Sequence, residues 1–168
     1  DKESKLIAIL KSDSPPQDKA ITCKKLVVCG TKASVPALAV FLSDEKLASW
    51  ARIGLEAIPD PAVDDAVRGA MSKLQGKLLV GVINSIGWGG DAKAVGGLIQ
   101  KTKDADTEAA SAAVAALGRI GGDEAVRTLE QMLPGATPAM LPVICEACLK
   151  CADSLVARGK HDKAAKLC

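Results

Sequence analysis

The sequence predicts an all-α protein, a right-handed α-solenoid of about five antiparallel helix pairs in one array over residues 1–168. A stretch of small and apolar residues at 116–126 recurs in similar order at 85–95. Internal repetition of this kind is typical of proteins built from stacked structural repeats. Aromatic residues make up only 2% of the chain, so we expect a core of small aliphatic side chains, which suits closely approaching helices. No stretch shows the apolar and polar alternation of a β-strand.

A valine near the start of each unit sets the predicted register. Val35, Val63, Val95 and Val126 recur 28, 32 and 31 residues apart. Each interval has room for two short helices, which we call the A helix and the B helix of a unit. The predicted units cover residues 1–31, 32–60, 61–90, 91–122 and 123–159, and a further unit starts at 160–168.

In the first half of the chain, turn and capping residues separate the expected helices. A leading pair covers 5–11 and 16–29, with Ser14-Pro15 before its second helix. Ser34 is expected to cap the next A helix, and Ser43 a B helix over 44–58 that ends at Pro59. Asp60-Pro61 then combines a capping carboxylate with a proline in the first helical turn, a strong helix start.

In the second half, the same signals continue. Asp91, Asp106 and Asp123 are the next expected caps, and Gly-Gly pairs before the first and last of them end the preceding helices. A longer helix follows 134–135 and runs to Ala157, with Pro142 near its start because proline is tolerated only in a first turn. Another helix is expected near Asp162.

Charge and hydropathy exclude two classes of partner. The formal net charge is +2 and charged residues make up 25% of the chain, so the positive charge is too dilute to predict nucleic-acid binding. No apolar run approaches the ~18 residues needed to span a bilayer, so we expect no membrane insertion. The chain begins at Asp1 without methionine, which fits either a removed signal peptide or a chosen start.

Candidate chemistry is sparse, and we expect no enzyme activity, no catalytic residues, no metal and no cofactor. His161 is the single histidine and lies in a turn, where an exposed polar role is expected. Cys145, Cys148 and Cys151 resemble an iron–sulfur run, but Leu155 stands where a fourth cysteine is expected. We expect these three thiols to be reduced, to share one side of a helix and to be mostly buried as small apolar groups.

The phrase Ala-Leu-Gly-Arg-Ile-Gly-Gly-Asp-Glu-Ala-Val at 116–126 resembles the HEAT-like repeat of phycobilisome lyases. The segment 86–98 matches less closely, and 55–67 and 27–38 only loosely. The sequence as a whole is also similar to long secreted HEAT-repeat proteins of planctomycete-like bacteria. The B helices at 47–48, 78–79 and 109–110 lack the arginine that this family usually carries in the first turn.

The predicted function is non-enzymatic protein–protein interaction or scaffolding through the concave B-helix side. The expected anchors are Trp50, Ile53, Asn84, Trp88 and Arg119, drawn from three successive units. In the alternative interpretation, the two tryptophans pack between adjacent repeats. The resemblance also allows a bilin-lyase-like enzyme or a tetrapyrrole-binding chaperone, and exposed repeat ends allow a self-assembling element that joins head to tail.

The cellular location stays open. The resemblance and the start at Asp1 favour an extracytoplasmic protein. The cysteines favour a reducing compartment, because neighbours on one helix rarely reach disulfide geometry. The identity of the protein partner is not encoded in any motif that we find.

Overall fold

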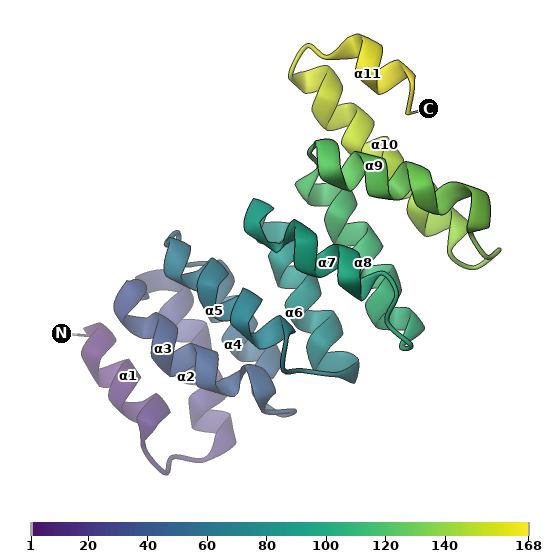
Figure 1. Cartoon of the computed structure of the whole chain (residues 1–168). Helices are drawn as coiled ribbons and strands as arrows, with labels where there is room; N and C mark the ends of the chain where they lie inside the picture. The colour runs from purple at the N-terminus through teal and green to yellow at the C-terminus, as the bar shows by residue number, and fades with distance from the viewer. Residues whose placement is uncertain (1, 168) are drawn as a thin grey trace. The chain divides into compact units, whose positions relative to one another are not determined.

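The structure, a computed structural model, describes residues 2–167 and is helical throughout, without a strand among those residues (Figure 1). The all-α prediction is therefore confirmed. The chain divides into two compact units, residues 1–85 and residues 86–168, and the division falls inside one helix. That helix, α6, runs over Gly76–Gly89 and gives residues 76–85 to unit 1 and residues 86–89 to unit 2.

Unit 1 is built from short helices. Its complete α-helices are α1 (Lys2–Lys11), α2 (Pro16–Cys29), α3 (Val35–Ala39), α4 (Ala48–Glu56) and α5 (Pro61–Met71), with 3-10 turns η1 (Lys32–Ser34) and η2 (Val40–Ser43). The B helices α2 and α4 pack against each other, while the A helix α3 contacts α1, α4 and α5. Leu26, Leu38 and Leu55 are fully buried at the centre of this packing.

In unit 2, shorter and longer helices alternate along the chain. This unit contains the end of α6, then η3 (Ala92–Ala94), α7 (Val95–Lys101), α8 (Thr107–Ile120), α9 (Asp123–Met132), η4 (Leu133–Gly135), α10 (Leu141–Ala157) and α11 (His161–Ala165). The B helix α8 packs against α7, α9 and α10, and α10 also contacts α11. Val114, Leu129 and Ile144 are fully buried within this unit.

The repeated glycines of α4 (Gly54), α6 (Gly87) and α8 (Gly118) lie where two B helices touch. A Cβ at Gly118 would lie 2.6 Å from the Cα of Ala147 on α10, and a Cβ at Gly87 would lie 3.0 Å from the Cα of Ala116 on α8. In unit 1, a Cβ at Gly54 would lie 3.3 Å from the Cys23 carbonyl oxygen on α2. The glycine of the repeated phrase is therefore explained by close helix approach, which a side chain would prevent.

Three of the predicted aspartate caps are confirmed. The carboxylates of Asp60, Asp91 and Asp106 each accept a backbone N–H two residues further on, at 2.9, 3.0 and 2.9 Å. These bonds satisfy donors that the first turn of a helix leaves unpaired. The register valines Val35 and Val95 open α3 and α7.

Other predicted caps are wrong. The Ser34 hydroxyl donates to Glu3 Oε1 at 2.6 Å, and Thr31 caps the preceding turn in its place. Asp44, and not Ser43, accepts the backbone N–H groups of Lys46 and Leu47 before α4. In both places a neighbouring or distant side chain offered a better partner than the nearest serine.

The remaining two expectations fail because of backbone geometry. Asp123 is the first residue of α9, after Gly122 at φ 93°, and so lies inside the helix that it was expected to cap. Ser14 bonds to Ser12, and α2 starts after Pro15 without a side-chain cap. The predicted starts of α5 and α10 at Pro61 and near Pro142 are confirmed.

Candidate functional site

The predicted anchors Trp50 and Ile53 lie one turn apart on α4, in unit 1. Ile53 is 44% exposed and Trp50 is half-buried. The ammonium of Lys24, from the neighbouring B helix α2, lies 5.5 Å from the centroid of the Trp50 ring. A cation at this distance from an indole face is attracted by the negative charge of the ring surface. The exposed sides of α2 and α4 therefore form one surface.

A second contact ties α4 to α6 beside that surface. Arg52 donates to the carbonyl oxygen of Gly81 at 3.1 Å, and the Ser85 hydroxyl donates to Glu56 Oε1 at 2.6 Å. A Cβ at Gly81 would lie 2.8 Å from the Arg52 guanidinium, so glycine makes room for this arginine. The predicted anchor Asn84 is half-buried on α6, next to Ser85.

In unit 2, the structure brings Trp88 and Arg119 together. The Arg119 guanidinium, at the end of α8, lies 5.1 Å from the centroid of the Trp88 ring at the end of α6. Trp88 is 72% exposed, the most exposed aromatic side chain of the chain. The interpretation in which Trp88 packs in the core does not fit this exposure.

The Arg119 side chain is partly buried beside the ring. Its Nη1 atom is buried and finds no hydrogen-bond partner among residues 2–167. An unpaired buried donor costs on the order of 1–3 kcal/mol, so this nitrogen makes the observed position of Arg119 less favourable. A hydrogen bond from Lys150 and the charge of Lys150 lower the pKa of Glu146 on α10, and the positive charge of Arg119 adds to the same shift.

The anchors thus form two groups, Trp50, Ile53 and Asn84 in unit 1 and the stacked pair in unit 2. That all five residues together form one continuous binding strip stays a prediction. The sequence reasoning missed the α2 side of the first group, where Ile21 is 50% exposed and Val28 is 84% exposed. Their spacing of seven residues, with Lys24 and Lys25 between them, was the signal for an apolar and basic helix face.

A lysine or arginine side chain from another helix lies over each of the three aromatic rings of the chain. Besides the two tryptophans, Phe41 in η2 lies 5.4 Å below the ammonium of Lys19 on α2. Such pairs add about 0.5–1 kcal/mol each at exposed sites. In both tryptophan pairs the ring and the cation come from B helices, α2 with α4 and α6 with α8.

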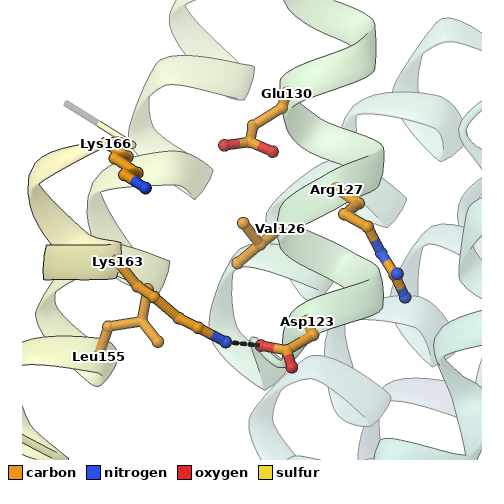
Figure 2. Close-up of a pocket in the computed structure, with 7 residues that line it drawn as sticks. All are labelled: Asp123, Val126, Arg127, Glu130, Leu155, Lys163 and Lys166. Atoms are coloured by element: carbon orange, nitrogen blue, oxygen red, sulfur yellow. Dashed lines mark hydrogen bonds and ion pairs between the residues drawn. The ribbon is translucent and has the colours of Figure 1, made fainter. Parts of the chain in front are cut away.

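A separate cavity of about 360 Å³ lies among α9, α10 and α11 in unit 2 (Figure 2). Lys163 and Asp123, which both line it, form an ion pair at 3.4 Å, and Glu130 points toward the side of Lys166 (Figure 2). The Arg127 guanidinium is turned away from the two lysines (Figure 2). Acidic and basic groups both line this cavity, and no nucleophile or metal-ligand set is among its lining residues, so we assign it no chemistry.

The expectation for the cysteines of α10 is wrong in one respect. Cys148 and Cys151 are buried, but Cys145 is exposed. Six residues turn a helix by about 600°, so Cys145 and Cys151 lie well apart around the axis and do not share one side. No disulfide joins the cysteines within residues 2–167, and Cys168 lies outside the described residues.

The remaining chemical expectations concern His161, metals and membranes. His161 is exposed at the first position of α11. Within the described part of the chain, no cluster of three or more histidine, cysteine or acidic residues is placed to hold a metal ion. No helix of residues 2–167 combines the length and apolar character that crossing a membrane requires.

Comparison with known proteins adds no assignment. No protein-family model matches the chain, and no curated protein matches it.

Proposed function

We propose that this chain is a HEAT-like α-solenoid that binds a protein partner along the exposed side of its B helices and has no catalytic role. The observation that carries the proposal is the Trp88–Arg119 pair, in which a tryptophan is 72% exposed and stacked against an arginine. Tryptophan and arginine are the side chains most enriched among the residues that dominate protein–protein binding energy.

The α2–α4 surface of unit 1 supports the same function. Trp50 lies under Lys24, and Ile53 and Val28 expose apolar area beside them. An apolar surface with lysines on it suits a partner segment that carries apolar and acidic side chains. The alternation of A and B helices and the glycines at B-helix contacts support the solenoid, because each unit then buries its face against the next.

Site-specific photo-crosslinking tests the proposal. A benzoylphenylalanine placed at Trp88 is expected to capture a discrete partner in extracts of the source cells. The matched position is Val40, which is 69% exposed in η2 and not itself on a B helix, and is expected to capture none of it. The Trp88→Ala variant should lose the partner in quantitative affinity capture, and Val40→Ala should retain it. Equal capture by both variants would rule out the B-helix side as the binding surface.

A further inference from the structure

The two cations that stack on the tryptophans lack an acidic partner within the described chain. Among residues 2–167, neither Lys24 nor Arg119 forms an ion pair with a carboxylate. Other basic residues do find one, such as Lys101, whose ammonium lies 3.1 Å from a carboxylate oxygen of Asp104. Each tryptophan therefore lies beside a positive charge that no described carboxylate pairs with directly.

Stacking on a ring uses only part of each cation. A ring face attracts positive charge, but it does not take up the several N–H donors of an ammonium or a guanidinium as oxygen atoms do. Lys24 is exposed, and Arg119 is partly exposed although its Nη1 is buried, so a partner can reach both side chains. The pKa of Glu146 is lowered first by Lys150 and only then by Arg119, and this carboxylate bonds to Lys150 at 2.5 Å. Arg119 therefore keeps bonding capacity for a carboxylate from outside.

In unit 1, the outer face of α2 combines positive charge with apolar area around Lys24. Successive residues of a helix are 100° apart, which places four side chains within about 100° of one another around the α2 axis, namely Ile21, Lys24, Lys25 and Val28. All four are exposed, and so is Gln17, which lies in the same arc. Lys25 also forms no ion pair with a described residue. This face is thus continuously exposed, basic and apolar.

We propose that the partner of the B-helix surface is an acidic protein segment, which sets one carboxylate against Lys24 and another against Arg119. This inference rests on the proposed function and adds the chemistry of the partner to it. A carboxylate that meets a stacked cation completes a charge-assisted hydrogen bond while the ring keeps the cation in place. Both units offer the same arrangement, a tryptophan on one B helix and a cation from a neighbouring B helix. Beside Lys24, Ile21 and Val28 receive apolar side chains of the same segment.

The charge of the chain favours a protein segment over a nucleic acid. The formal net charge is only +2, and Lys24 and Arg119 belong to different units. A phosphate backbone is bound by a dense basic patch, because many phosphates must be neutralised together. Single carboxylates are instead matched by single cations, and such complementary charge selects and orients a protein partner.

Selection of peptides from a random display library on the immobilised full chain tests the acidic partner. The enriched peptides should contain more Asp and Glu than the starting library. By fluorescence anisotropy, one group of them should bind about three- to ten-fold more weakly to Lys24→Gln, and another group to Arg119→Gln. The matched variants Lys32→Gln and Arg127→Gln remove exposed charges outside the B helices and should leave binding unchanged. Added salt should weaken binding of both groups.

The outcomes separate this inference from the proposed function. Peptides that require Trp50 or Trp88, lack acidic enrichment and bind both charge variants as tightly as wild type overturn the acidic partner and leave the proposed function standing. If no selected peptide loses binding to Trp50→Ala or Trp88→Ala, both proposals fail. Binding of an oligothymidylate that the two charge variants lose identifies a nucleic acid and also overturns the inference. Circular dichroism checks that each variant is folded, and if Arg119→Gln is not, Lys24→Gln and the peptide composition still decide.

Discussion

At the scale of single residues, Gly118 links the repeated phrase of the sequence to the packing of unit 2. The sequence showed that glycine recurs at this position, but not what it touches. The structure gives the reason, because Ala147 of α10 occupies the space that a side chain at Gly118 would need. A glycine inside a helix normally costs about 0.5–1 kcal/mol relative to alanine, so here close approach outweighs helix propensity.

Replacing Gly118 by alanine is expected to destabilise the protein by about 1–3 kcal/mol, because the new Cβ forces α8 away from α10. The matched variant is Gly96→Ala on α7, where a Cβ would meet nothing within 4 Å. That change is expected to be neutral or to stabilise by about 0.4–1 kcal/mol. Equilibrium denaturation measures both. Equal effects of the two substitutions would show that close approach does not explain Gly118.

The helix caps show how well the roles of single residues could be predicted from the sequence. Asp60, Asp91 and Asp106 were found because an aspartate before a helical run bonds to backbone two residues away, a local interaction. Ser34 was misassigned because its partner is Glu3, which is distant in sequence. Local sequence patterns predict hydrogen bonds between near neighbours in the chain. They carry no information about a competing partner on another helix.

At the scale of the element, α10 has two different faces. Its buried face holds Cys151, and burial raises the pKa of that thiol to about 11. Its outer face holds Cys145, which is exposed. The predicted boundaries of this helix were close to those observed. The prediction that the three cysteines share one face was wrong. A step of three residues drifts by about 60° around the helix, so two such steps move Cys145 off the buried side.

The two faces predict unequal thiol reactivity in the native protein. Only the thiolate reacts with alkylating agents, and the raised pKa keeps Cys151 protonated at pH values where an ordinary thiol ionises. Brief treatment with iodoacetamide at pH 8 should therefore modify Cys145 and spare Cys151, as read by peptide mass spectrometry. In denaturant both should react. Modification of Cys151 at the rate of Cys145 in folded protein would contradict this assignment of faces.

At the scale of the whole molecule, the all-α class was predictable because the repeat, the scarcity of aromatics and the lack of strand patterns point the same way. The site was predictable only in part. Helix periodicity placed Trp50 and Trp88 on B helices, but it carries no information on which side chain of the next helix covers a ring. The cations over both rings, Lys24 and Arg119, come from helices about 30 residues away in sequence. The proposed function depends on such pairs.

The central claim is that Trp88 is kept at the surface for recognition and does not stabilise the core. Equilibrium unfolding of Trp88→Ala, beside the core variant Leu117→Ala, tests it most directly. Trp88→Ala is expected to cost about 0.5–1 kcal/mol, the worth of the contact with Arg119. Leu117→Ala, at a fully buried position of α8, is expected to cost about 2–5 kcal/mol. A loss of about 3–5 kcal/mol for Trp88→Ala would show that this tryptophan belongs to the core and would contradict the proposed binding surface.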